Sequence, residues 1–209
     1  RGTRRYTAAE LAETIDNLGA SLTTAAGNNT AYVNAFALTE DVPRVIDLVA
    51  EVMLRPTFPA DEWERTRPRL LAAIDRQRDA WFGELNHAFR QRYYAGHPWS
   101  TTPLGVRDVV AALTPADLEA HHASHLSAKD TVIAVVGDVE PEAVRDRVAR
   151  AFADLPASAE QPFEAAAPGD RPAGVTQVAT DKPLAAVYVG LGPGVARDHD
   201  DYPVLRVLT

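Results

Sequence analysis

The sequence contains no cysteine, which excludes disulfide bridges, cysteine-ligated zinc fingers and thiol catalysis. It has no apolar run of about 18 residues and therefore no transmembrane helix. Its first ten residues lack the apolar segment of a secretory signal. Basic side chains are in deficit, because 21 lysines and arginines face 29 acids and give a net charge of −8. This balance argues against a nucleic-acid partner. We expect a soluble protein, cytoplasmic or periplasmic in a bacterium.

The chain does contain an irregular alternation of helical and strand-like patterns. Thr7 and Glu10 have the spacing of a capping box at the start of a helix. The segments "ASLTTAAG" and "NTAYVNAFAL" flank a glycine and asparagine turn, which predicts a β-hairpin. The other predicted elements are helices at 8–18, 42–54, 61–78, 84–94, 141–152 and 200–208, a helix that begins after Thr114, and strands at 131–137, 174–180 and 184–192.

These elements indicate an α+β fold in which helices cover an antiparallel sheet, because hairpins and helices alternate irregularly along the chain. After the helix at 141–152 the composition shifts to alanine, proline, glutamate and glycine. Such a composition predicts a linker, followed by further strand-like segments.

Local motifs give three weak candidates for chemistry. His121 and His125 are four residues apart on a predicted helix, so both could face one metal ion. No acid lies between them as in a zinc-protease helix, and a structural helix is favoured. His97 lies in a Pro-Trp loop and is favoured as a turn residue over a catalytic base. The stretch "GLGPG" at 190–194 lacks the continuation of a phosphate-binding loop.

The arginine-rich helix at 61–78 poses a sharper question. Leu70, Leu71 and Ile74 mark an apolar face on it. At the turn where a buried acid could stand, the sequence has Ala72 and Ala73. The helix is therefore either an ordinary surface helix or a catalytic helix that lacks its acid.

The order of segments along the chain resembles that of the insulinase, pitrilysin and mitochondrial processing peptidase family of zinc metallopeptidases. The resemblance runs through "RGTRRYTAAELAETIDNLGASL", "TEDVPRVIDLVAEVMLRPTFPADEWERTR", "YYAGHPWSTTPLG" and "LTPADLEAHHASHLSAKDTVIAVVGDVEPEAVRDRVARAFADLP". It implies a first peptidase-like domain at 1–155 that lacks its N-terminal strands and its zinc-motif helix. A linker at 156–173 and the start of a second homologous domain at 174–209 would follow. The resemblance also implies that the helix with His121 and His125 is an ordinary one.

The resemblance implies where zinc ligands belong. Family members bind zinc through His-x-x-Glu-His on a helix that leads into Gly-Thr. Gly2-Thr3 takes that place here, so the motif, if the full-length protein has one, lies just upstream of Arg1. The third ligand, a glutamate on a later helix, falls on Ala73, and Thr66 replaces a second acid seven residues earlier. A methyl group cannot bind zinc, and Asp75 points roughly 200° around the helix from Ala73. No metal ligand or catalytic residue is therefore predicted within this chain.

In the family a peptide substrate adds as a strand to an exposed edge strand. The corresponding residues here are Leu22, Thr23, Thr24, Ala25 and Ala26, and we expect them to contact peptide. Strand addition uses backbone hydrogen bonds and does not need the metal. Thr23-Thr24 stand where the family commonly has Asn-Ala. The alternative is that these residues merely form the edge of the sheet.

Three functions are compatible with the resemblance. The favoured one is a non-catalytic subunit or half that forms the substrate chamber, contacts peptide, and pairs with an active homologue or with itself. Zinc would then belong to the active partner, and this chain would hold no cofactor. The second is an active zinc endopeptidase with its motif upstream and a third ligand from an unexpected residue, so that the full-length protein would hold the zinc. The third is a structural scaffold subunit without peptide binding.

Overall fold

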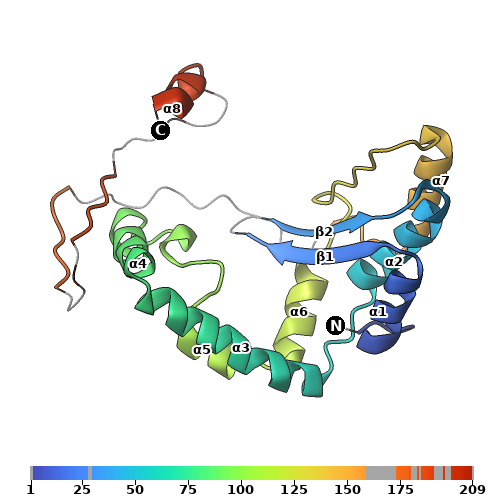
Figure 1. Ribbon diagram of the computed structural model, residues 1–209, viewed down its shortest axis with the longest axis horizontal. Coiled ribbons are helices and arrows are strands. Elements are labelled where there is room, and N and C mark those ends of the chain that lie inside the picture. Colours follow the sequence, from blue (N-terminus) through green and yellow to red (C-terminus); the bar gives the residue numbers. More distant parts are fainter. Residues whose placement is uncertain are drawn as a thin grey trace. The chain divides into compact units, whose positions relative to one another are not determined.

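The computed structural model describes residues 2–27, 30–158, 173–179, 183, 185–190, 195 and 199–208 (Figure 1). The chain divides into two compact units, one of Arg1–Ile74 and Pro103–Ala165 and the other of Asp75–Thr102 and Ala166–Thr209. The elements in chain order are α1 Ala8–Asn17, β1 Ser21–Ala26, β2 Ala31–Phe36, the 3-10 helix η1 Thr39–Asp41, α2 Val42–Leu54, α3 Ala60–Asp79, α4 Trp81–Tyr93, the 3-10 helix η2 Pro98–Ser100, α5 Arg107–Ala112, α6 Pro115–His125, α7 Pro141–Ala151 and α8 Tyr202–Leu208.

The α+β prediction is confirmed: the described residues form helices and a small antiparallel hairpin, and the predicted helices form within a few residues of their expected ends. The capping box at the start of α1 forms as expected, since Thr7 and Glu10 bond each other's backbone N–H groups. Gly19 has a φ of +58° just after α1, a conformation that glycine adopts without strain. Helix α5, of six residues, was not predicted from the sequence. None of the described helices is long and apolar enough to cross a bilayer.

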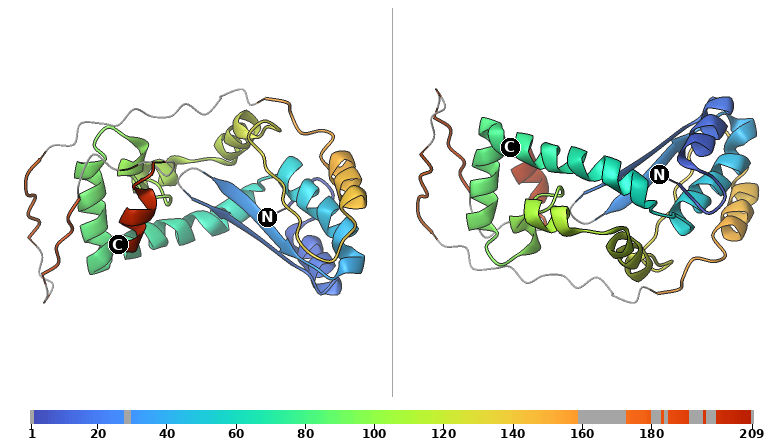
Figure 2. Two further views of the ribbon diagram at one scale, coloured as in Figure 1. Left: turned by 90° about the horizontal axis from the view of Figure 1, so that it is seen from above. Right: turned by 90° about the horizontal axis from the view of Figure 1, so that it is seen from below.

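The core of the first unit lies between α2 and α7, which are neighbours in both views of Figure 2. Ile46 and Ala50 of α2 pack with Phe152 at the end of α7, and all three are buried. Val42, Val49 and Met53 of α2 border this cluster. A forked ion pair between Arg147 and Asp47 joins the same two helices at their surface.

The loop at residues 2–6 is held against the end of α2 by a buried acid. Glu51 is only 3% exposed, and its carboxylate accepts a bond of 3.1 Å from the backbone N–H of Arg5. Arg55, one turn later on α2, places its guanidinium 3.3 Å from the same carboxylate. Backbone bonds from Arg4 to Arg55 and from Thr57 to Gly2 complete the attachment. The buried charge is thus both paired and hydrogen-bonded, as burial requires.

The prediction of a buried strand at 131–137 is wrong. Residues 131–136 belong to no ladder, and Val132 and Val136 are 92% and 97% exposed. Ile133 and Val135 point the other way and line a shallow hollow beside α7. The side chains alternate as in a strand, but within the part of the chain that the structure describes the only ladder joins β1 to β2. A strand-like sequence without a neighbouring strand cannot form strand hydrogen bonds, so its apolar residues remain exposed.

In the second unit, an extended segment at 185–190 lies along α4. The ring of Tyr188 is 4.4 Å from that of Phe89, centroid to centroid, and Gly190 lies so close to Tyr93 that a Cβ would come within 2.6 Å of the ring. The predicted strand pair at 174–180 and 184–192 is not formed in its described residues, 174–179 and 185–190, which join no ladder. As at 131–136, the strand pattern has no partner among the residues that the structure describes.

Candidate functional site

The arginine-rich helix α3 is anchored by two buried apolar residues, Trp63 and Ile74, which are 7% and 3% exposed. The indole Nε1 of Trp63 donates a bond of 2.9 Å to the carbonyl of Leu113, immediately before α6. Thr66 and Ala73 are half-buried and seven residues apart. A spacing of seven residues brings both to one face of the helix, adjacent to the anchored face. Thr66 and Ala73, the two positions where the resemblance places acids, therefore lie on one face of α3, as their spacing requires.

The same face carries a cation that was not predicted from the sequence. Arg69 is three residues after Thr66 and four before Ala73, so it is the helical neighbour of both. Its side chain is exposed and has no ion-pair partner among the described residues. The i, i+3 and i, i+4 spacing was the signal that could have revealed it. A guanidinium beside this position opposes the binding of a metal cation there.

The described residues include no group of three or more histidine, cysteine, aspartate or glutamate side chains placed to hold a metal ion. The face of α3 that carries Thr66 and Ala73 thus presents a hydroxyl, a methyl group and a guanidinium. None of these is a ligand that zinc prefers in proteins.

The five residues predicted to contact peptide all lie in β1, which pairs antiparallel with β2 from Ser21 opposite Phe36 to Ala26 opposite Ala31. Leu22 is half-buried, and the other four residues are exposed. Among the residues that the structure describes, β1 pairs with β2 alone, so its outer edge is open. Both strands of this two-stranded sheet are edge strands, and the contact of β1 with peptide stays a prediction.

The hydrogen-bonding register tells which backbone groups of β1 face the open edge. The N–H of Gly27 donates to the carbonyl of Thr30, so Gly27 and Thr30 occupy a hydrogen-bonded position of the ladder. In an antiparallel ladder such pairs alternate with pairs whose N–H and C=O groups point outward. The outward groups on β1 therefore belong to Leu22, Thr24 and Ala26. On β2 the residue opposite Thr24 is Val33, whose N–H points to the other free edge.

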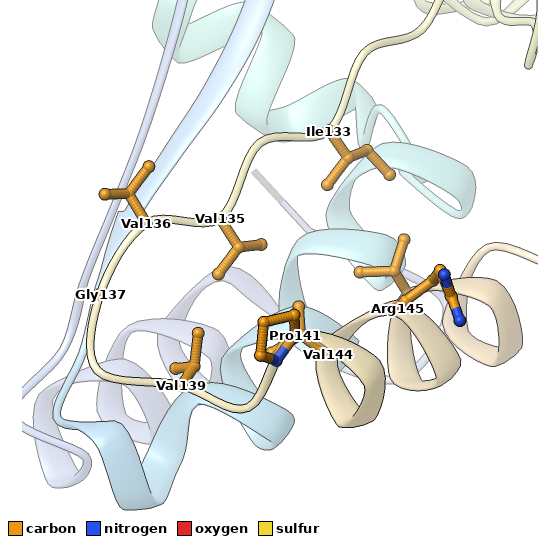
Figure 3. Close-up of a pocket in the computed structure, with 9 residues that line it drawn as sticks. Ile133, Val135, Val136, Gly137, Val139, Pro141, Val144 and Arg145 are labelled. Atoms are coloured by element: carbon orange, nitrogen blue, oxygen red, sulfur yellow. The ribbon is translucent and has the colours of Figure 1, made fainter.

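The remaining candidates have structural roles or fall outside the structure. The Nδ1 atom of His97 accepts a bond of 3.1 Å from the N–H of Trp99, and its ring contacts those of Tyr94 and Trp99, which confirms the turn prediction. The stretch at 191–194 lies outside the described residues. The hollow beside α7 measures about 500 Å³ and is lined by apolar side chains and Arg145 (Figure 3). Arg145 pairs with Glu142 of its own helix, so no set of polar groups converges on the hollow.

Three histidines lie on the last two turns of α6. The Nε2 atom of His122 is 2.7 Å from the carbonyl oxygen of Met53, so His122 joins α6 to α2. The rings of His121 and His125 lie 4.2 Å apart, centroid to centroid. Desolvation by its surroundings lowers the pKa of His121, and the rings of His125 and His122 lower it further, although the side chain as a whole is solvent-exposed.

Comparisons with known proteins cover almost the whole chain. Residues 1–102 match the family model "Insulinase (Peptidase family M16)", and residues 112–209 match the model "Peptidase M16 inactive domain". An uncharacterized zinc protease of Mycobacterium leprae is 27% identical over 140 residues, which are 67% of this chain and 32% of that protein. The mitochondrial-processing peptidase subunit beta of Neurospora crassa is 26% identical over 162 residues, 76% of this chain and 33% of that protein.

A solved structure agrees with the sequence matches. The crystal structure of a peptidase M16 inactive domain from Pseudomonas fluorescens superposes with a TM-score of 0.68 and 28% identity, over 78% of this chain and 41% of that one. The chain spans about a third of the length of the two curated relatives named above.

Proposed function

Since the chain belongs to the insulinase-like, or M16, family of metallopeptidases, we propose that it is a non-catalytic half or subunit of such a peptidase. In this role it forms part of the substrate chamber, binds peptide along the outer edge of β1, and works beside an active homologue. The observation that carries the proposal is the face of α3 on which Ala73 stands where the resemblance puts a zinc-binding glutamate.

Zinc chemistry explains why this substitution matters. A catalytic zinc site uses three protein ligands and leaves its fourth position to water. Ala73 offers no donor atom, and Arg69 adds a positive charge one turn away. Two upstream histidines and solvent would hold zinc weakly and would not fix the geometry that activates the bound water. Under this proposal the zinc that hydrolyses the peptide is held by the partner.

Peptide binding remains available without the metal. Leu22, Thr24 and Ala26 present three N–H groups and three C=O groups to the open edge of β1. No charged side chain occurs in β1, so the edge gives an added strand backbone bonds without selecting its charge. A peptide pairing with this edge would extend the hairpin to three strands, which are more stable than an isolated pair.

A second candidate function is an active zinc endopeptidase. It is favoured by the name of the Mycobacterium leprae relative, a zinc protease, and by the match of residues 1–102 to the insulinase model. This function requires a carboxylate or imidazole from elsewhere in the full-length protein to complete the zinc site in place of Ala73.

Zinc content decides between the two functions. The full-length protein is purified without chelator and without a partner, and zinc per chain is measured by mass spectrometry before and after dialysis against EDTA. We expect no zinc that survives dialysis. One zinc per chain that resists the chelator would overturn the non-catalytic assignment and favour the endopeptidase.

Peptide binding is tested at the strand edge. We expect Thr24→Pro to weaken binding of a fluorescein-labelled, Val/Thr/Ser-rich peptide about fivefold, the equivalent of one backbone hydrogen bond. Proline at this position removes an N–H that β2 does not use, so the hairpin survives. Thr24→Val is the control for the side chain, and Val33→Pro removes the corresponding N–H on the opposite edge. Binding that responds to Val33→Pro and ignores Thr24→Pro would transfer the site from β1 to β2.

A further inference from the structure

We propose that His121 and His125 of α6 chelate a divalent transition-metal ion at the surface of the protein, copper(II) more tightly than zinc(II). This inference does not rest on the proposed function and concerns a different helix from α3. It uses the pair of side chains on α6 that the peptidase resemblance leaves without a role.

The geometry of α6 brings both imidazoles to one place. Residues four apart on a helix lie on one face, and two histidines at this spacing are a recurrent zinc-binding arrangement. The two ring centroids are 4.2 Å apart and the ring planes are inclined by 36°. Both side chains are exposed. Because each nitrogen ligand lies about 2.0–2.1 Å from the metal, small rotations suffice to place one ion between them.

His125 is already held in the tautomer that a metal needs. Its Nδ1 atom is 2.9 Å from the carbonyl oxygen of His121, and a carbonyl can only accept a hydrogen bond, so Nδ1 carries the proton. The lone pair of Nε2 is therefore available for a metal. A ring N–H bonded to a backbone carbonyl is the usual support for a metal-ligating histidine. Ser124 reinforces it, since its hydroxyl is 2.9 Å from the same Nδ1 and donates to the same carbonyl.

The neighbouring histidine shows what a structural role looks like on this helix. His122 uses its Nε2 on the carbonyl of Met53 and sets its ring edge against Phe58, so this nitrogen is engaged by the protein. His121, by contrast, has no hydrogen bond from its ring nitrogens to any described residue. The two types of histidine lie one position apart, which provides a matched control.

The ligand set determines the class of metal and the strength of binding. Two imidazoles suit copper, zinc and nickel, and copper(II) binds such sites more tightly than zinc(II). The described part of the chain supplies no third histidine, cysteine, aspartate or glutamate to this pair. Water completes the coordination sphere, so the ion is exchangeable and is released by EDTA. This lability separates it from the chelator-resistant zinc on which the test of function depends.

The test is calorimetric titration of the untagged, metal-free chain with CuCl₂ and with ZnCl₂. We expect one copper(II) to bind tightly per chain. His121→Gln and His125→Gln should each lower the affinity about tenfold or more, because removing even an outer-shell partner of a metal ligand costs that much. Ser124→Ala should weaken binding less than either. Circular dichroism checks that each variant keeps its helix content.

Two controls keep the proposal open to refutation. His87→Gln removes a histidine from α4, and His122→Gln removes the neighbour on α6, so both should leave the affinity unchanged. Electron paramagnetic resonance of the copper(II) form should show two nitrogen ligands in the wild type and one in each pair variant. An affinity that is the same in the double variant His121→Gln/His125→Gln as in the wild type would overturn the proposal.

Discussion

Helices α3 and α6 reverse the roles that the resemblance assigns to them. On α3, the face that should contribute to a zinc site carries Thr66, Arg69 and Ala73, none of which is a zinc ligand. On α6, which the resemblance makes an ordinary helix, His121 and His125 lie side by side with one ring already oriented. If α6 binds copper(II) as proposed, the capacity to bind a metal follows from side chains at i, i+4 spacing and their hydrogen bonds. The place of a helix in the fold does not confer it.

The largest effect is expected where the two helices are joined. Trp63→Ala removes a buried indole from α3 and its bond to Leu113, and it should lower the free energy of unfolding by about 3–5 kcal/mol. Trp63→Phe should cost less, because it keeps most of the buried volume and loses mainly the hydrogen bond. Urea denaturation measures both. Copper(II) binding that persists in Trp63→Ala under folding conditions would show that α6 presents its ligands independently of α3. A smaller loss of unfolding free energy in Trp63→Ala than in Trp63→Phe would contradict the anchoring role.

Transplanting the pair sharpens the comparison directly. Arg69→His with Ala73→His places two histidines at i, i+4 on α3 and removes the opposing guanidinium. If spacing is what matters, the chain should bind about two copper(II) ions where the wild type binds one. Arg69→Gln with Ala73→Gln is the control with matched helix propensity. A chain that still binds a single copper(II) would show that the hydrogen bond which orients His125 on α6 is indispensable.

A smaller effect is expected at the start of α6. Thr114 and Asp117 form a capping box, in which each side chain accepts a bond from the other's backbone N–H. Thr114→Ala should lower the free energy of unfolding by about 1 kcal/mol, whereas Thr114→Ser should restore most of it. Thermal unfolding followed by circular dichroism measures the difference. Because the pair lies at the other end of the helix, copper(II) affinity should be unaffected, and a parallel loss of affinity would contradict this separation.

The smallest effect is a dependence on pH at the same cap. Hydrogen bonds from the Thr114 side chain and backbone lower the pKa of Asp117 below its usual 3.8. A depressed folded-state pKa means that the contribution is fully present above the unfolded value and is lost as pH falls through the folded one. Between about pH 5 and pH 2, stability should therefore fall more in the wild type than in Asp117→Asn. Urea denaturation at each pH measures the free energy of unfolding. An equal fall of this free energy with pH in the two proteins would contradict the prediction.

How far the sequence predicted the molecule depended on how local each signal was. Capping boxes, helical periodicity and the turn after β1 act within a few residues, so α1, α2, α3, α6 and the hairpin were predicted correctly. The segment at 131–136 has the composition of a strand, but a strand exists only with a neighbour, and the residues that the structure describes provide none.

The site was predictable in a similar way and to a similar extent. The alanine at position 73 and the edge-strand residues came from the resemblance and stand as predictions. The place of Arg69 on the face of Thr66 and Ala73 follows from helical spacing, but the prediction for this face covered acidic side chains only. The orientation of His125 depends on a bond to the carbonyl of His121, and no spacing rule predicts which tautomer that bond selects.

The contact between Glu51 and the loop at residues 2–6 has a consequence for which substitutions this region accepts. The buried carboxylate is bonded at 3.1 Å to the main-chain N–H of residue 5, whereas the guanidinium of Arg5 is 3.9 Å away and 72% exposed. Every amino acid except proline supplies that N–H. Position 5 can therefore vary widely without detaching the loop, while position 51 is restricted to a side chain that can accept two bonds in a closed space. The attachment of the loop to α2 therefore depends on the residue at position 51 far more than on the residue at position 5.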